Sequence, residues 1–279
     1  MRNVKSIKCI IAAVLVVAIV ACGALVATKT GVFEEETTTT EPVTVPTARV
    51  TFIEGITVNE CFKLLEENSV ASYDELMQAA QNYQFTGNKV FSDIPVENNR
   101  AFKLEGYLFP DTYDFYLDES PESVIERFLS NADSKITDEM RARASELGYT
   151  MDEILTIASI IQAESYFEKD APLIASVIYN RLESGTPLGM DSAWFYIERN
   201  IGDYLGEESI EKYEEYYHTY DFHGLPEGPI CNPGMVAINA ALYPEETDYF
   251  YFCNDEDGNI YYAVTDSEHI ENCEKIGIY

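Results

Sequence analysis

The pattern of apolar and polar positions divides the chain into an apolar N-terminal run, a polar stretch and a long mixed segment. Residues 9–28 carry no charged side chain and are mostly apolar. About 20 such residues cross the hydrocarbon core of a bilayer as a helix. The pattern therefore predicts a transmembrane anchor over 9–28, followed by a linker over 29–48 that is rich in Thr, Glu and Pro.

The charges beside this run predict its orientation. Arg2, Lys5 and Lys8 precede it, and an excess of basic residues on one side predicts a cytoplasmic N-terminus. A cleaved lipoprotein signal is the alternative, because small residues precede Cys22. The apolar run continues past that cysteine to Ala27, which favours an uncleaved, single-pass anchor in the cell membrane. Both interpretations place the remaining chain outside the cytoplasm.

Residues 49–90 have the pattern of a strand followed by two short helices. The two helices are predicted to begin after Thr57 and Ser72, each of which has a Glu three positions later, as in a capping box. We predict a small subdomain, interpreted either as a docking or carbohydrate-binding module or as a structural lobe of residues 91–279.

The segment 91–279 mixes helical and strand patterns, which predicts an α+β fold. Its apolar periodicity predicts helices over 121–133, 138–147, 151–165, 171–183 and 235–242. Alternating and aromatic runs predict a strand and turn over 103–113 and a hairpin of 249–253 with 260–264. The remaining stretches predict an acidic, solvated insertion over 203–217 and a loop fixed by Pro and Gly over 224–234.

The charge balance excludes whole classes of partner. The chain has 18 basic and 49 acidic residues, a formal net charge of −31. Phosphate neutralisation requires surface Lys and Arg, so a nucleic-acid binder is excluded. Broad adhesion to anionic lipid is excluded for the same reason.

The cysteines outside the anchor give no metal-binding motif. Cys61, Cys231, Cys253 and Cys273 include no Cys-x-x-Cys pair, and the three histidines are not spaced as metal ligands. We predict no metal site and interpret the four cysteines as buried apolar residues. A disulfide such as Cys253–Cys273 is the alternative.

Glu164 is the strongest candidate for chemistry. At 100° per residue it lies within about 60° of Ile157, Ile160 and Ile161, at the end of the predicted helix over 151–165. Burial raises the pKa of a carboxyl group, and the negative end of a helix dipole raises it further. A carboxyl that stays protonated near neutral pH can act as a general acid. The alternative is a helix-end Glu that points to solvent.

The location narrows the chemistry of such an acid. Nucleotide cofactors are not reliably present outside the cytoplasm, and the sequence contains no Gly-rich phosphate loop and no nucleophile elbow. Aromatic loops can stack on sugar rings. An acid with aromatic surfaces and no cofactor fits cleavage of glycosidic bonds.

Five motifs, in this order, resemble those of the endolytic murein transglycosylases, the MltG or YceG-like family. They are LEGYLFPDTY (104–113), ASIIQAE (158–164), VIYNRL (177–182), GLPEGPICNPG (224–234), and YFYF (249–252) with Glu268-His269. The resemblance covers about residues 49–270 and also the single anchor. Each motif alone is weak, whereas the set is highly specific.

The resemblance implies an anchored enzyme with a LysM-like subdomain over 49–90 and a catalytic domain over 91–279. Such an enzyme cuts inside peptidoglycan glycan strands, at the β-1,4 bond after N-acetylmuramic acid. It leaves a 1,6-anhydro end, needs no cofactor, and is expected to end the elongation of nascent strands. Peptidoglycan synthases of the elongation machinery are the expected protein partners.

The resemblance also places the site residues. The family's catalytic Glu falls on Glu164, and a usual Glu-Lys-Glu run is here Gln162-Ala163-Glu164. The family's loop Asp falls on Asp191, where the usual following Pro is Ser192. The family's Tyr-Asn-Thr-Tyr falls on 217–220, where His218 replaces Asn.

We expect six residues to bind substrate beside Glu164. The polar candidates position sugar hydroxyls, with loop-fixing hydrogen bonds as the alternative, and the tyrosines line the groove, with a core position as the alternative. These candidates are Asp191, Glu105, Asn232, Tyr196, Tyr217 and Tyr220. Two rival functions are a hydrolase that uses water and Asp191, and a non-catalytic scaffold that binds the cell wall through residues 49–90.

Overall fold

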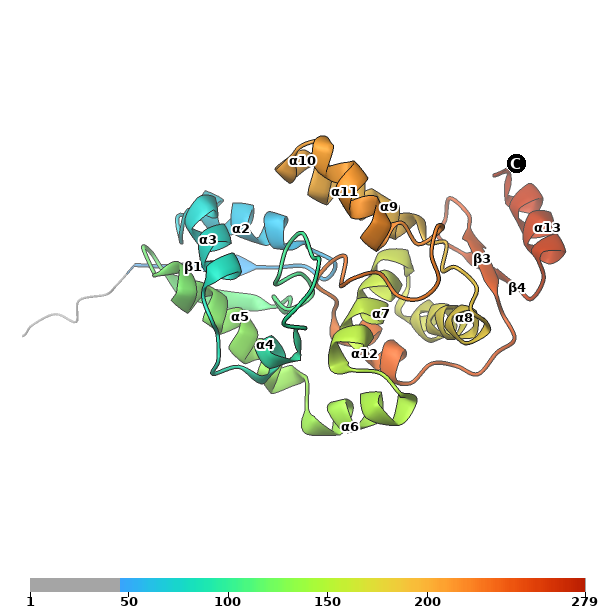
Figure 1. Cartoon of the computed structure of the whole chain (residues 1–279), viewed down its shortest axis with the longest axis horizontal. Coiled ribbons are helices and arrows are strands. Elements are labelled where there is room, and N and C mark those ends of the chain that lie inside the picture. Colours follow the sequence, from blue (N-terminus) through green and yellow to red (C-terminus); the bar gives the residue numbers. More distant parts are fainter. Residues whose placement is uncertain (1–45, 279) are drawn as a thin grey trace, which may run out of the picture. The chain divides into compact units, whose positions relative to one another are not determined.

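The computed structural model of the chain describes residues 46–278 (Figure 1). The predicted anchor over 9–28 lies outside the described residues and stays a prediction, as does most of the linker. From residue 46 to residue 278, no helix is both long enough and apolar enough to cross a membrane. The predicted α+β composition is confirmed, since helices and two small sheets alternate along the chain.

The first sheet joins segments far apart in sequence. β1 (Thr47–Thr51) pairs antiparallel with β2 (Thr112–Tyr116), with Val50 opposite Tyr113. Between these strands come the helices α2 (Val58–Glu67), α3 (Tyr73–Asn82) and α4 (Lys89–Asp93). The capping box that opens α2 is present, and the Ser72 side chain caps α3. The strand of the segment 49–90 thus finds its partner beyond residue 90.

The aromatic motif 104–113 differs from its predicted strand. Residues 103–107 form consecutive turns, and the strand begins only at Thr112. Gly106 has a φ of +86°, which lies in the left-handed region and interrupts any strand there. Tyr107 is buried, and its hydroxyl donates to the carboxylate of Asp152, which also pairs with Arg100. The motif is therefore a buried loop fixed by turns and a polar cluster.

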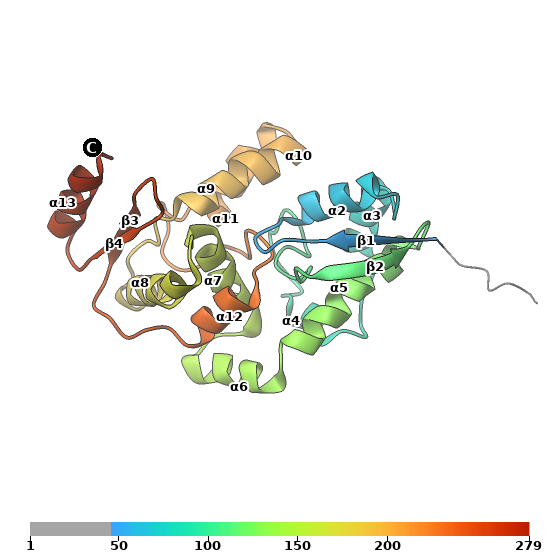
Figure 2. The same cartoon turned by 180° about the vertical axis from the view of Figure 1, so that it is seen from behind.

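A group of helices surrounds α7 (Met151–Glu164). α5 (Pro121–Lys135) packs on α3, and α7 packs against its neighbours in space, which are α6 (Asp138–Leu147), α8 (Ala171–Ser184) and α12 (Met235–Leu242). These bounds confirm the predicted helices within one or two residues. Figures 1 and 2 show β1, β2, α2, α3 and α5 grouped on one side of α7.

The acidic segment predicted as a solvated insertion is helical. After α8 and a loop come α9 (Asp191–Tyr196), a π-helical turn η2 (Ile197–Gly202), α10 (Asp203–Leu205) and α11 (Glu208–Tyr217). Tyr213 and Tyr217 are buried. They lie four positions apart, on one face of α11, so the apolar stripe holds this helix against η2.

A hairpin and a terminal helix close the described part. β3 (Tyr251–Asn254) and β4 (Ile260–Ala263) are antiparallel, with Cys253 opposite Tyr261. Gly258 lies in the turn with a φ of +79°, as the Asp-Gly signal predicts. α13 (Asp266–Ile276), which the sequence analysis did not predict, packs on both strands. Figures 1 and 2 show this unit beside α8, on the side of α7 away from β1.

Candidate active site

Glu164 is the last residue of α7 and continues its buried face. Ile157, Ile160 and Ile161 have no exposed surface, whereas Glu164 itself is half-buried. A capping box of Thr150 with Glu153 fixes the start of α7, and therefore its register. The predicted orientation is confirmed, because the Glu164 side chain borders a cavity instead of bulk solvent.

The start of α9 meets the Glu164 carboxyl group. The backbone N–H of Ser192 donates to Glu164 Oε1 at 3.4 Å. Burial is the main cause of a raised pKa of Glu164; contact with Ser192 opposes this effect, and the charge of Asp191 adds to it. The carboxyl therefore keeps its proton to a higher pH than an ordinary Glu.

The cavity beside Glu164 has a volume of about 510 Å³. Its lining comes from the end of α7, from α8 and the loop after it, from the start of α9, from the loop after α11, from β3, and from α13 and the residues that follow it: Glu164, Arg181, Gly189, Met190, Asp191, Tyr220, Tyr251, Phe252, Cys253, Asn254, His269, Cys273 and Ile278. The Tyr220 hydroxyl donates to Asp191 Oδ1 at 2.7 Å. Three of the predicted site residues, Glu164, Asp191 and Tyr220, thus lie in one cavity.

An Arg-Tyr-His row forms a wall that the sequence analysis did not assign. The Arg181 guanidinium lies 5.1 Å from the centre of the Tyr251 ring, which stacks on His269 at 5.3 Å. Arg181 donates to the carbonyl oxygens of Leu188 and Phe250 at 2.5 and 2.6 Å, so its position is fixed. Arg181, Tyr251 and His269 all belong to motifs that carry the family resemblance. Their place in these motifs was the signal in the sequence that could have identified them as site residues.

Four predicted substrate-binding residues lie elsewhere. Glu105, Asn232, Tyr196 and Tyr217 are at most 2% exposed. This burial is at odds with their predicted contact with sugar. It corrects that prediction in favour of the alternatives, which were loop-fixing hydrogen bonds and positions in the core.

Glu105 organises this second, buried cluster. Its carboxyl accepts from Val58 N at 3.0 Å, from the Tyr196 hydroxyl at 3.3 Å and from Asn232 Nδ2 at 3.5 Å. Burial raises the pKa of Glu105 to about 8, although the hydrogen bonds from Val58 and Tyr196 lower it. Asn232 also accepts from Leu108 N at 2.8 Å. The cluster joins the start of α2, the end of α9 and the loops that contain Glu105 and Asn232, and it is structural.

The loop 224–234, which contains the predicted residue Asn232, does not line this cavity. The loop packs along α7 instead: Ile230 N donates to Ser159 Oγ, and Gly234 N donates to Gln162 Oε1, both at 3.0 Å. The hairpin and α13 contribute to the cavity wall. His218, which replaces the family's Asn, contacts Asp221 at 2.5 Å and packs beside Trp194.

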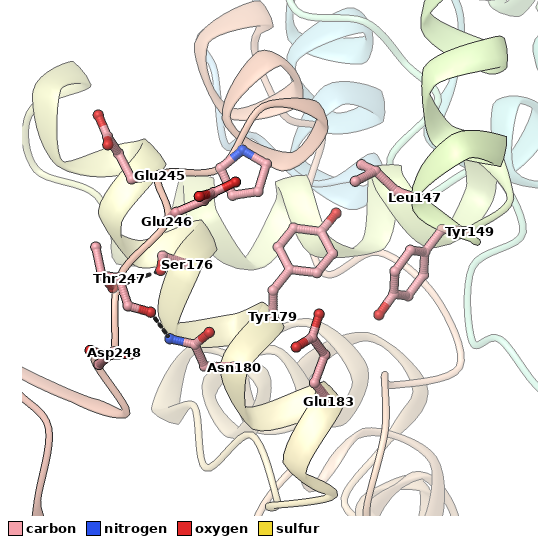
Figure 3. Close-up of a pocket in the computed structure, with 11 residues that line it drawn as sticks. Leu147, Tyr149, Ser176, Tyr179, Asn180, Glu183, Glu245, Glu246, Thr247 and Asp248 are labelled. Atoms are coloured by element: carbon pink, nitrogen blue, oxygen red, sulfur yellow. Dashed lines mark hydrogen bonds between the residues drawn. The ribbon is translucent and has the colours of Figure 1, made fainter.

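A second cavity of about 510 Å³ lies between α8 and residues 244–248 (Figure 3). Its polar groups hold the chain together, since Asn180 donates to Thr247 O at 2.8 Å and Ser176 bonds Thr247 through their hydroxyls. Figure 3 shows Glu183 and Tyr179 facing this space. Glu164 does not line it, so we assign the candidate active site to the first cavity.

Comparison with known proteins agrees with the motifs. Residues 31–275 match the YceG-like family. The endolytic murein transglycosylase of Bacillus subtilis (strain 168) is 31% identical over 234 residues, which cover 81% of this chain and 64% of that protein. That of Streptococcus pneumoniae serotype 2 is 32% identical over 189 residues, 66% of this chain and 34% of that protein. This chain therefore spans only part of the length of both relatives.

A solved structure agrees with the fold. The crystal structure of a yceG-like protein from Listeria monocytogenes matches with a TM-score of 0.71 and 28% identity, and the match covers 81% of this chain and 76% of that one. The family match extends over far more than half of the sequence. This chain belongs to the YceG-like family.

Proposed function

We propose that this chain is a membrane-anchored endolytic lytic transglycosylase that cleaves the glycan strands of peptidoglycan. The observation that carries the proposal is the half-buried Glu164 carboxyl, with its raised pKa, on the wall of a cavity that also contains Asp191 and Tyr220. The two named relatives support the same activity class.

Glu164 acts first as an acid and then as a base. Its protonated carboxyl donates to the oxygen that links N-acetylmuramic acid to the next sugar, and the bond from that oxygen to C1 breaks. The acetamido group of the substrate stabilises the positive charge at C1. The Glu164 carboxylate then removes the proton of the 6-hydroxyl, whose oxygen attacks C1. The products are a 1,6-anhydro end and a free 4-hydroxyl, and Glu164 regains its proton.

The other cavity residues have positioning roles in this scheme. The Asp191 carboxylate, fixed by the Tyr220 hydroxyl, offers an acceptor for sugar hydroxyls. The exposed part of Tyr220 and the Tyr251 ring provide aromatic surface for sugar faces. Arg181 is tied to two carbonyl oxygens and holds the Tyr251 ring in place.

Product analysis tests the reaction class. Purified full-length protein in detergent is incubated with glycan strands, and the masses of the released fragments are measured by mass spectrometry. The expected fragments carry 1,6-anhydro ends, which are lighter by one water molecule than reducing ends. Reducing ends from the wild-type protein would reject the transglycosylase in favour of a hydrolase.

The hydrolase stays the second candidate because Asp191 places another carboxylate in the same cavity. In that reaction Asp191 activates a water molecule, and the product ends are reducing. A non-catalytic scaffold predicts no fragments of either kind, so the same experiment separates all three functions.

The surroundings of the enzyme complete the proposal. The anchor over 9–28 places the catalytic part outside the cytoplasm, where peptidoglycan lies, and cleavage there ends strand elongation beside peptidoglycan synthases. β1 and β2 pair antiparallel, with α2, α3 and α4 between them along the chain, and this arrangement supports a LysM-like subdomain that contacts the glycan. The orientation of the anchor is tested by adding protease to cells that have lost their wall but keep an intact membrane. The C-terminal part should then be cleaved.

A further inference from the structure

Three metal-binding side chains meet in the wall of the Glu164 cavity. Cys253 comes from β3, whereas His269 and Cys273 lie one turn apart on α13. One potential ligand atom of each residue lies within 4.8 Å of those of the other two. Cys273 Sγ is 3.8 Å from His269 Nε2 and 3.9 Å from Nδ1. The thiols are not joined, and both cysteines are buried.

We propose that Cys253, His269 and Cys273 form a zinc site. In a tetrahedral zinc site, bonds of about 2.3 Å to sulfur and about 2.0 Å to nitrogen place neighbouring ligand atoms roughly 3.5–3.8 Å apart. Cys273 Sγ lies near this distance from both His269 ring nitrogens, so the ring has to turn for one nitrogen to face the ion. Two ligands at positions i and i+4 of a helix, with a third from another element, are typical of zinc sites.

The ligand type and the charge balance favour Zn²⁺ over other cations. Two thiolates and one imidazole are soft or borderline ligands, which suit zinc and not Mg²⁺ or Ca²⁺. The two thiolates neutralise the charge of the ion, so the nearby Arg181 guanidinium faces no net positive charge. The three ligand atoms already lie within 4.8 Å of one another, and the His269 ring stacks on Tyr251 at a ring separation of 5.3 Å. The site is thus partly organised by the fold.

The position of the site indicates its role. α13 packs against β3 and β4, and the ligands come from both α13 and β3. A bound zinc ion fastens the terminal helix to the hairpin and so fixes one wall of the cavity. Three protein ligands leave a fourth position for water or for an oxygen atom of a molecule in the cavity. The proposal does not depend on glycan cleavage, since Glu164 needs no metal for its acid and base steps.

Metal analysis tests the site directly. Full-length protein without a histidine tag is purified in detergent with a reductant, given ZnCl₂, dialysed, and measured for zinc. We expect about one zinc ion per chain in the wild type and none in the double variant Cys253→Ser/Cys273→Ser. The matched control is Cys61→Ser/Cys231→Ser, which alters two buried cysteines outside the cluster and should keep the zinc.

Two further measurements identify the ligands. Co²⁺ in place of Zn²⁺ should give a thiolate-to-cobalt absorption band, lost in Cys253→Ser/Cys273→Ser and altered in His269→Ala. Zinc should raise the melting temperature of the wild type and of the control, but not that of His269→Ala. A wild type that retains no zinc, equal zinc in both double variants, or a Cys253–Cys273 disulfide in protein alkylated directly from cells would overturn the proposal.

Discussion

The backbone N–H of Ser192 points at Glu164 Oε1 across 3.4 Å, so the first turn of α9 touches the last residue of α7. A donor at this place stabilises the ionised carboxylate and opposes the effect of burial. Proline has no N–H to donate, so a proline at this position would lack this contact. The contact with Ser192 therefore limits the rise in the pKa of Glu164.

Replacing Ser192 with proline should remove the hydrogen bond from its backbone N–H to Glu164. We expect Ser192→Pro to raise the pKa of Glu164 further. Since the proposed reaction requires protonated Glu164, activity should fall as the pH rises through this pKa, and the alkaline limb of the pH–rate profile should move to higher pH. The second position of a helix tolerates proline here, as Pro172 in α8 shows.

Ser192→Ala is the matched control, because alanine keeps the backbone N–H and loses only a hydroxyl that has no hydrogen-bond partner in the described structure. Its alkaline limb should stay close to that of the wild type. Equal shifts in both variants would mean that the hydroxyl group, and not the backbone donor, sets the pKa of Glu164.

Glu164→Gln should abolish cleavage and leave the fold intact. Gln has the size of a protonated Glu but cannot give up a proton. One general acid contributes about 10²–10⁴-fold in rate, and Glu164 serves as acid and then as base, so the loss should reach the upper end. The free energy of unfolding should hold or rise slightly, because ionising a carboxyl in a partly apolar pocket is unfavourable.

The rate is measured by release of soluble fragments from glycan strands, and stability by urea unfolding. Glu183→Gln is the matched control, since Glu183 lines the second cavity, and it should cleave at the wild-type rate. An active Glu164→Gln enzyme would show that another residue is the acid.

Asp191→Asn separates positioning of sugar from activation of water. If Asp191 only binds sugar hydroxyls, the variant should mainly raise KM and lose far less activity than Glu164→Gln. If it activates water, kcat should fall about as much as in Glu164→Gln. Tyr220→Phe removes the hydroxyl that donates to Asp191 Oδ1. If Asp191 only binds sugar hydroxyls, this variant should also raise KM, but by less than Asp191→Asn.

The local parts of this site could be predicted from the sequence. The capping pair at Thr150 and the apolar periodicity fix the start and the face of α7, and with them the direction of Glu164. Both signals lie within one helix. The Asp-Gly turn of the hairpin could also be predicted, because its conformation depends only on the residues of the turn itself.

The non-local parts could not be predicted. Glu105 resembles a sugar-binding carboxylate in sequence, yet its partners Val58, Tyr196 and Asn232 come from three distant segments and bury it. His269 and Cys273 are four positions apart in the sequence, as two metal ligands on one helix would be. This spacing was not recognised, because the histidines were compared only with one another. The contribution of Cys253 to that cluster depends on the packing of α13, a helix that was not predicted.

Gly106 and Pro229, from two of the family motifs, interlock tightly. A Cβ at Gly106 would lie 2.4 Å from Pro229 Cγ, and the φ of +86° disfavours any other residue. Gly106→Ala should therefore lower the free energy of unfolding by the backbone strain of about 1–2 kcal/mol and by a further 1–3 kcal/mol or so for the overpacking.

Gly148→Ala is the control for backbone strain alone. Its φ is +87°, and nothing lies within 4 Å of the added Cβ. Only the cost of about 1–2 kcal/mol should appear in urea unfolding. Equal losses in both variants would mean that the contact with Pro229 relaxes without cost.

Glu105 should make the protein less stable as the pH rises. Burial raises its pKa to about 8 in the folded state, whereas an unfolded Glu titrates near 4.3. Between these values the folded chain holds a proton that the unfolded chain has released. The free energy of unfolding attributable to Glu105 is therefore largest at low pH and falls with rising pH, by at most about 1.4 kcal/mol per pH unit, until the pH passes 8.

Glu105→Gln tests this dependence, because Gln can accept from Val58 N and donate to the Tyr196 oxygen without titrating. The difference in unfolding free energy between variant and wild type should grow in favour of the variant from pH 5 to pH 8, measured by urea unfolding at constant ionic strength. Glu67→Gln, a variant of an exposed carboxyl at the end of α2, should show no such growth. A constant difference for Glu105→Gln would mean that the three donors around Glu105 hold it ionised, and that the cluster is charged throughout this range.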